Sequence, residues 1–391
     1  MRAGLATSIA ISMFALAGAA AADEPAEVEA PPDNEHYTLR AEVGTEFDSN
    51  AKRTETIAGT ELPPRVRSFL QRLVLGGTFS DVVSPRHAVA VSGIAAGKIF
   101  DASEARSENV AIAQSSGAWR VRLGERSRLT ASGTYYEAFQ ARHDDPVAEA
   151  ERRDFRSLIP NLQLGWLATD TVDLSLTAGW RWLVFKSDRD FDFAGPTAAV
   201  DLRWGLQRED AADWEAGAGA AVEHRGFAGP AFMPACTPTG LPCPGPNLRR
   251  DDLYTAHVEV TRTGLLLAGA GYAFHYNASN SFGDAVMRHF AIVRFAASLP
   301  FELALAARAE LLFAHYRDVL NLAIDPSSVG SRFVSVEDEN RSSARIDLSR
   351  ALGEHLRLLA RYTLYVSELG GNAGSYLRQT ALLSLAYTLE K

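Results

Sequence analysis

One segment, from Val172 to Val184, alternates apolar and polar residues without a break. The apolar members are Val172, Leu174, Leu176, Ala178, Trp180, Trp182 and Val184, and between them stand Asp173, Ser175, Thr177, Gly179 and Arg181. Because successive side chains of a strand point to opposite faces, the pattern predicts a strand with one apolar and one polar wall. The segment is longer than an ordinary strand and suits a tilted membrane crossing, which takes about 9–11 residues. Similar segments recur to the end of the chain, so we predict an all-β fold, a transmembrane antiparallel up-and-down β-barrel.

The first 35 residues read as an export signal followed by a linker. Met1 and Arg2 supply a positive start, residues 10–16 are apolar, and the alanines at 20–22 are typical of a cleavage site. No later stretch approaches the roughly 18 uncharged apolar residues of a membrane-spanning helix. We therefore predict a signal peptide over 1–22, a short acidic periplasmic linker over 23–35, and a barrel over 36–391 in the bacterial outer membrane.

The alternation divides the rest of the chain into about 16 candidate strands, with 18 as the alternative count. They are placed at 36–47, 66–80, 87–100, 108–123, 127–140, 154–167, 171–187, 193–207, 212–225, 252–263, 265–277, 287–299, 301–316, 339–350, 354–368 and 375–390. Their connections are alternately short and long, and the longest predicted loops are 226–251 and 317–338. This is typical of periplasmic turns and external loops.

The apolar sides of several candidate strands are interpreted as lipid-facing. They include Leu73, Leu75 and Phe79; Leu162, Leu164 and Trp166; Val200, Leu202, Trp204 and Leu206; Val258 and Val260; Leu358, Ala360, Tyr362, Leu364 and Val366; and Leu383, Leu385, Tyr387 and Leu389. Aromatic residues gather near the predicted periplasmic ends (Trp166, Trp204, Trp214, Tyr387) and external ends (Phe100, Tyr135, Trp182, Phe274, Tyr276, Phe313). Two such bands are typical of membrane-interface belts. The alternative explanation is that aromatic residues simply favour strands.

The competing fold is a soluble all-β protein, such as a sandwich or a propeller. Its strands would average about 5–6 residues, with turn signals closer together. The long segments here favour the membrane barrel. A barrel of about 16 strands leaves an aqueous channel rather than a packed interior.

Charged residues stand on the sides opposite the apolar walls and would face the lumen. The pore-lining candidates are Arg181, Arg203, Arg308, Arg345, Arg357, Arg361, Arg378, Glu259 and Glu310, accompanied by Arg40, Glu42, Arg72, Asp201, Glu215, Glu223, His257 and Asp347. Arg357 and Arg361 share one face of a strand, with Arg345 and Arg378 on its neighbours, so they predict a basic wall that favours anionic solutes or acidic sugars. The alternative is that these charges pair across strands and select nothing.

Cys236 and Cys243 are the only cysteines, and both lie in the long predicted loop 226–251. In an oxidising compartment they would form a disulfide that closes a small, proline-stiffened loop. Metal binding would need further ligands nearby, and none stands next to them in the sequence.

The closest arrangements to catalytic groups are His143-Asp144-Asp145 in a predicted loop and His257 with Glu259 in a strand. Sequence spacing cannot establish that a nucleophile, a base and a carboxylate converge. No phosphate-binding loop, metal-ligand spacing or dinucleotide fingerprint is present. We therefore expect no enzyme activity and no cofactor. The net charge of −9 argues against nucleic-acid binding, which needs a basic face.

The first strand ends in Phe47-Asp48-Ser49-Asn50, and the last runs from Tyr376 to Leu389. These segments resemble the aromatic-Asp-Ser-Asn opening and the closing strand of outer-membrane barrels from exopolysaccharide and capsule export loci. The resemblance implies translocation of a secreted polysaccharide through the lumen, with periplasmic export partners supplied by other proteins. The alternative is a general or solute-selective diffusion porin that passes small polar solutes. A barrel hydrolase and a structural surface protein rank below both, and the outer-membrane lipid surrounds the barrel in every case.

Overall fold

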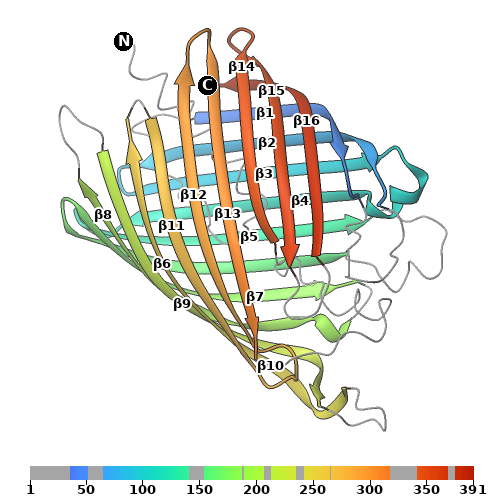
Figure 1. Cartoon of the computed structure of the whole chain (residues 1–391). Helices are drawn as coiled ribbons and strands as arrows, with labels where there is room; N and C mark the ends of the chain where they lie inside the picture. Colours follow the sequence, from blue (N-terminus) through green and yellow to red (C-terminus); the bar gives the residue numbers. More distant parts are fainter. Residues whose placement is uncertain are drawn as a thin grey trace.

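The chain folds into a barrel, seen from the side in the computed structural model of Figure 1. The structure describes residues 36–51, 65–140, 154–186, 189–206, 213–234, 242–264, 266–317, 341–368 and 375–391. Within these ranges sixteen strands form: β1 (His36–Asp48), β2 (Ser68–Ser84), β3 (His87–Phe100), β4 (Val110–Arg122), β5 (Ser127–Gln140), β6 (Phe155–Thr169), β7 (Val172–Phe185), β8 (Phe193–Leu206), β9 (Asp213–Met233), β10 (Cys243–Thr263), β11 (Leu266–Ser279), β12 (Val286–Leu299), β13 (Leu303–Tyr316), β14 (Arg341–Ala351), β15 (Leu356–Glu368) and β16 (Ser375–Glu390). The predicted signal peptide (1–22) and linker (23–35) lie outside the described residues and stay predictions.

Each strand pairs in antiparallel fashion with its neighbours in the sequence, and β1 pairs with β16 to close the ring. The seam between β1 and β16 runs without a register shift from Thr38 opposite Glu390 to Asp48 opposite Thr380. Closure is required in a membrane, because lipid cannot satisfy the hydrogen bonds of an open edge. The predicted all-β barrel of 16 strands is therefore confirmed, and the alternative of 18 is wrong.

One end of the barrel, here called the turn end, holds the first residue of β1, the last of β16 and the short connections between even- and odd-numbered strands. The opposite end, the loop end, holds the longer connections, and two of them contain the 3-10 helices η2 (Ser103–Glu108) and η4 (Arg189–Phe191). Among the described residues, no helix has the length and apolarity needed to cross a membrane.

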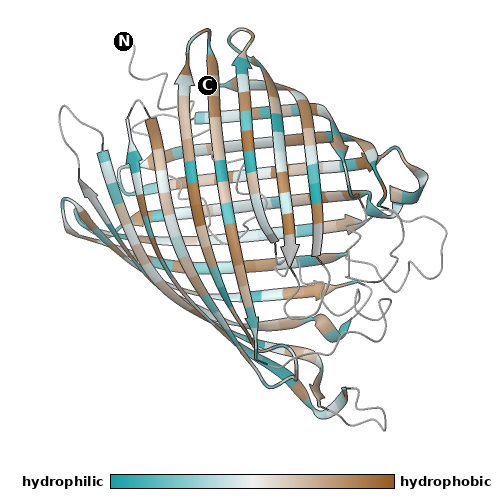
Figure 2. Cartoon of the chain, viewed as in Figure 1, coloured by the Kyte–Doolittle hydropathy of each residue, from teal (hydrophilic) through white to brown (hydrophobic). Residues whose placement is uncertain are grey.

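The predicted alternation of faces appears along β7. Leu176, Trp180 and Trp182 are exposed on the outside, whereas Ser175 and Arg181 are buried on the inside. Figure 2 shows the same banding of hydrophobic and hydrophilic residues on the strands seen from this side. An outer wall that exposes large apolar side chains is stable only in contact with hydrocarbon, so the exterior of the barrel is a lipid-facing surface.

Aromatic side chains mark both ends of the outer wall. The exposed rings near the turn end are Trp119, Trp166, Trp204, Trp214 and Tyr387, and those near the loop end include Phe69, Phe139, Trp180, Trp182 and Phe313. The prediction that Phe100 belongs to the outer band is wrong. Lys98 and Phe100 share the inward face of β3, and Phe100 is buried beside Leu70 because β3 ends on an inward position.

The predicted long loop 226–251 is also wrong, because most of it is strand. β9 continues to Met233 and β10 starts at Cys243, so their hairpin rises beyond the other strands at the loop end (Figure 1). The glycines and prolines that suggested a loop are accommodated by register shifts between Pro244 and Arg250. The β11–β12 connection braces this hairpin, since Asn280 Nδ2 donates to the Leu248 carbonyl oxygen over 3.0 Å.

Two apolar clusters fill part of the loop end on the inward side. The Phe155 cluster combines Ala138, Phe155, Leu183, Phe185, Phe193 and Phe227, with Ile112, Tyr136 and Phe191 against it. The Leu70 cluster combines Ala51, Leu70, Phe100 and Ala105, with Val66 and Ala102 against it. Phe191 belongs to η4 and Ala105 to η2, so both short helices dock on the inner wall through apolar contacts.

Candidate functional site on the inner wall of the barrel

The inward face of the described strands carries more basic than acidic side chains. The register places Arg40, Arg72, Lys98, Arg120, Arg122, Arg128, Arg181, Arg203, Arg225, Arg249, Arg288, Arg294, Arg308, Arg345, Arg357, Arg361 and Arg378 on this face. The acidic residues there are Glu42, Glu46, Asp48, Asp173, Asp201, Asp213, Glu215, Glu223, Asp251, Glu259, Glu310, Asp347 and Glu390. All nine pore-lining candidates from the sequence are among them. The excess of arginine contrasts with the acidic net charge of the whole chain, −9.

The deepest ion pair lies at the seam. The Arg378 guanidinium donates to both carboxylate oxygens of Asp48, over 2.5 to 3.1 Å, and both side chains are buried. Asp48 also accepts the backbone N–H of Asn50 over 3.0 Å. Ser49 joins β1 to β16, since its N–H donates to the Gln379 carbonyl oxygen and its hydroxyl accepts the Gln379 N–H. The Asp48-Ser49-Asn50 motif therefore fastens the first strand to the last.

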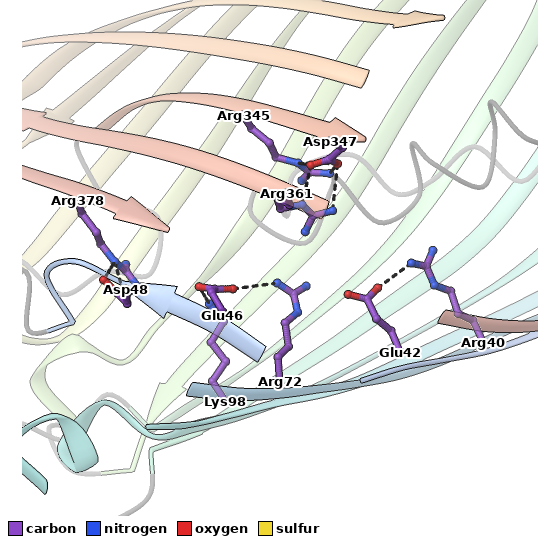
Figure 3. Close-up of polar contacts among 10 residues, drawn as sticks. All are labelled: Arg40, Glu42, Glu46, Asp48, Arg72, Lys98, Arg345, Asp347, Arg361 and Arg378. Carbon is purple, nitrogen blue, oxygen red and sulfur yellow. Dashed lines mark hydrogen bonds and ion pairs between the residues drawn. The ribbon is translucent and has the colours of Figure 1, made fainter. Parts of the chain in front are cut away.

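Next to the seam, Glu46 is shared by two cations. It accepts the Lys98 ammonium over 3.3 Å and lies 3.8 Å from the Arg72 guanidinium (Figure 3). The three side chains come from β1, β2 and β3, on three successive strands of the wall. One carboxylate thus faces two cations, and the group keeps a net positive charge.

A second shared carboxylate lies on the other side of the seam. Asp347 on β14 accepts both Arg345 on its own strand and Arg361 on β15, over 3.0 Å and 2.8 Å respectively from their Nε atoms. Figure 3 shows the three side chains gathered opposite the Glu46 group. Asp347 is buried, whereas the two guanidinium groups are more exposed, so cations form the inward surface of this cluster.

Arg357 differs from its neighbours. It lies on the inward face of β15, four residues before Arg361, and has no hydrogen bond or ion pair with any other described residue. Arg357 and Arg361 both repel the guanidinium of Arg40, which is held by Glu42 over 2.7 Å. We call Arg40, Arg72, Arg345, Arg357 and Arg361 the arginine cluster. Arg40 is repelled by Arg357 and Arg361, and Arg72 by Arg361 and Arg345, while Glu42 attracts both Arg40 and Arg72.

Carboxylate–guanidinium contacts continue on the other strands of the inner wall, including β13, where Arg308 stands directly opposite Arg345. Glu223 accepts Arg225 over 2.6 Å and Arg181 over 3.5 Å. Glu259 accepts Arg294 over 2.8 Å, and Glu310 accepts Arg308 over 3.1 Å. Arg203 lies on β8 on the same inward face, opposite Gly217.

Several charged residues on the inward face were not singled out from the sequence. They include Glu46, Asp48, Lys98, Arg120, Arg122, Arg128, Asp173, Arg225, Arg249, Asp251, Arg288 and Arg294. Most of them follow the same alternation of inward and outward residues, so the sequence pattern could have identified them. Arg249 and Asp251 were missed for a different reason, because they fall in the segment predicted to be a loop. They pair over 2.6 Å and hold the β9–β10 hairpin to the β11–β12 connection, where Arg249 also lies 3.1 Å from Asp284.

The remaining sequence candidates fall partly outside the described residues. Cys243 opens β10, but Cys236 is not described, so their pairing stays a prediction. His143, Asp144 and Asp145 are not described either. His257 lies 3.7 Å from Asp201 across β9, which gives it an acidic neighbour. Across the residue ranges that the structure describes, no group of three His, Cys, Asp or Glu side chains could hold a metal.

The closed antiparallel barrel, its apolar exterior and its charged interior define a β-barrel protein of the bacterial outer membrane. In such barrels the short turns face the periplasm, so the loop end is external. No protein-family model matches the sequence, and no curated protein matches it closely enough to count as a relative.

Solved barrel structures superpose along nearly the whole chain at very low sequence identity. OpdK from Pseudomonas aeruginosa is 11% identical, with a TM-score of 0.47 over 91% of this chain and 99% of that chain. OpdQ from the same organism is 9% identical, with a TM-score of 0.47 over 91% and 98%. A mutant of TodX, a monoaromatic hydrocarbon channel, is 10% identical, with a TM-score of 0.40 over 94% of both chains. Because these scores lie below 0.5, the fold rests on the strand pairing, and no cargo is transferred from these proteins.

Proposed function

We propose that this protein is a diffusion porin of the outer membrane that passes small polar solutes and prefers anions. The observation that carries the proposal is the arginine cluster, and within it Arg357, which has no partner among the described residues. A barrel of about 16 strands leaves an aqueous channel, so side chains on its inner face meet the permeating solute.

The physical basis of the preference is the field that these charges create. Charges on a low-dielectric wall focus their potential into the water between the walls and raise the local concentration of counter-ions. Rings of arginine or lysine are the arrangement that selects anions in pores. Here the carboxylates Glu46 and Asp347 each face two cations, so pairing leaves a positive excess on this side of the lumen.

Polysaccharide export was the leading expectation from the sequence, and it depended on the Asp48-Ser49-Asn50 motif. In the structure these residues fasten β1 to β16 through Arg378 and Gln379. A motif that closes the barrel carries no information about the cargo. The porin proposal therefore needs no periplasmic export partner, no cofactor and no catalytic residue.

The direct test is conductance of the purified protein in planar bilayers under a tenfold KCl gradient. We expect steady open channels. Their reversal potential should be shifted toward the equilibrium potential of chloride, which means that chloride permeates faster than potassium. Liposome swelling would complement it, with gluconate or glucuronate entering faster than an uncharged sugar of equal size. A barrel that conducts no ions, or a channel that prefers cations, would contradict the proposal. Loss of polymer secretion on gene deletion, with solute uptake unchanged, would favour export instead.

A further inference from the structure

A compact polar cluster lies on the outward face of β5, β6 and β7 at the loop end. It consists of Tyr135, Glu137, Phe139, Arg156 and Lys186. The Lys186 ammonium donates to Glu137 over 2.9 Å and lies 4.0 Å from the centre of the Phe139 ring. The Tyr135 hydroxyl donates to the other Glu137 oxygen over 2.7 Å. Arg156 stands directly opposite Glu137 on the next strand.

The position of the cluster along the barrel axis determines whether acyl chains, lipid headgroups or water surround it. Glu137, Arg156 and Val184 form one row across the three strands, and the next row toward the turn end is Tyr135, Leu158 and Trp182. Leu158 and Trp182 are exposed on the lipid-facing surface. Tryptophan and tyrosine side chains at the ends of membrane strands sit at the level of the lipid headgroups. The cations of the cluster therefore reach the headgroup layer of the external leaflet.

The charges of the cluster are unbalanced in favour of an anion. Two cations share one carboxylate, and Arg156 is exposed and has no hydrogen bond or ion pair with any other described residue. The Lys186 side chain is held between Glu137 and the Phe139 ring, which fixes the position of its ammonium group before any ligand arrives. A fixed ammonium beside a guanidinium whose donors make no hydrogen bond to a described residue is an arrangement that binds phosphate oxygens, since both groups supply charged donors.

We propose that Arg156 and Lys186 hold a phosphate of a phosphorylated lipid headgroup in the external leaflet. The lipid source, rather than free phosphate, follows from the outward position of the cluster and from the exposed Leu158 and Trp182, against which acyl chains would pack. Glu137 positions Lys186 through its hydrogen bond and weakens the site by its own negative charge. The site is separate from the lumen, because all five side chains stand on the outward face.

The test uses the full mature barrel in detergent and native mass spectrometry with bisphosphorylated lipid A and with chemically dephosphorylated lipid A. We expect the phosphorylated form to bind more tightly. R156Q and K186Q should each weaken its binding by about fivefold, as expected for one cation near a charged membrane surface. E137Q should strengthen binding, and K186R should retain it. The matched control is R350Q, which removes an exposed outward arginine near the turn end of β14.

The possible results separate the sources of affinity. Equal binding of both lipid A forms to the wild type would overturn the proposal, because apolar contacts alone would then hold the lipid. Unchanged selectivity in the R156Q/K186Q double variant would overturn it too, because other groups would then recognise the phosphate. A site that binds millimolar inorganic phosphate but does not prefer phosphorylated over dephosphorylated lipid A would be a site for free anions. That result would overturn the proposal as well. The variants should keep wild-type conductance, because the cluster does not face the lumen.

Discussion

Arg378 and Asp48 form a buried, two-oxygen ion pair between residues that lie 330 positions apart in the chain. The pair joins the last strand to the first at the external end of the seam. It lies beside the backbone hydrogen bonds of Ser49 with Gln379, where the β1–β16 ladder ends. The ring is therefore secured by side chains at the place where the backbone ladder alone would fray.

Removing one partner of this pair should destabilise the barrel strongly. R378Q leaves the buried Asp48 carboxylate without its cation, and breaking a buried pair in this way costs about 3–5 kcal/mol. The matched control is R126Q, which breaks the exposed Arg126–Asp170 pair at the turn end and should cost about 0–1 kcal/mol. Urea unfolding in lipid vesicles measures both free energies. Equal losses in the two variants would refute the special role of the seam pair.

Gly44 should tolerate no side chain, because it lies on β1 against β16. A Cβ at this position would come within 2.5 Å of the Ser384 Cβ and 2.7 Å of the Leu383 carbonyl oxygen. We expect G44A to cost about 1–3 kcal/mol through overpacking of the seam. At Gly117 on β4, an added Cβ would meet no atom within 4 Å, so G117A should leave the unfolding free energy unchanged or slightly raised.

Arg357 should set part of the anion preference. R357Q removes an unpartnered cation from the inner wall, so the chloride-to-potassium permeability ratio should fall, by at most about fivefold for one charge in water. R350Q, on the outward face one strand away, should leave the ratio unchanged. Reversal potentials should be measured near 0.1 M salt, where the Debye length is about 10 Å, and again at 1 M, where screening should shrink the difference.

Substitutions in the turn between β12 and β13 should increase the stability of the barrel. Phe301 and Glu302 have φ angles of 63° and 59°, and the Leu303 N–H points back to the Pro300 carbonyl oxygen over 3.4 Å. Two left-handed residues in a row define a hairpin turn that favours Asn-Gly. The F301N/E302G double variant should therefore raise the unfolding free energy by about 1 kcal/mol. A lower stability would show that Phe301, which is 82% exposed, anchors the barrel in the membrane interface.

Strand number, direction and facing could be predicted from the sequence because each follows from one local rule. The alternation in β7 assigned Trp180 and Trp182 to the outside and Arg181 to the inside, and the structure agrees. The rule also holds at Phe100, which follows the period of β3 onto the inward face, so its assignment to the outer aromatic band went against the alternation. What the local pattern does not show is that η2 folds back to pack beside it in the Leu70 cluster.

The partners of the inner charges could not be predicted, because pairing depends on register between strands that are distant in the sequence. Asp48 was noticed only as part of a motif, and its contact with Arg378 needs the ring to close. The extension of β9 and β10 was not predicted, because glycine and proline in this segment suggested a loop. In the structure, register shifts accommodate these residues within the paired strands. In both cases the missing information is the position of the neighbouring strand.

The two apolar clusters at the external mouth should make the structure of the channel entrance depend on temperature. The wall of the barrel is held by backbone ladders and by lipid, but the Phe155 and Leu70 clusters are held by burial away from water. Stabilisation of that kind weakens on cooling. The short helices η2 and η4, docked on the wall through these clusters, should therefore loosen in the cold while the strands below them stay paired, so that the entrance of the channel has its own cold limit.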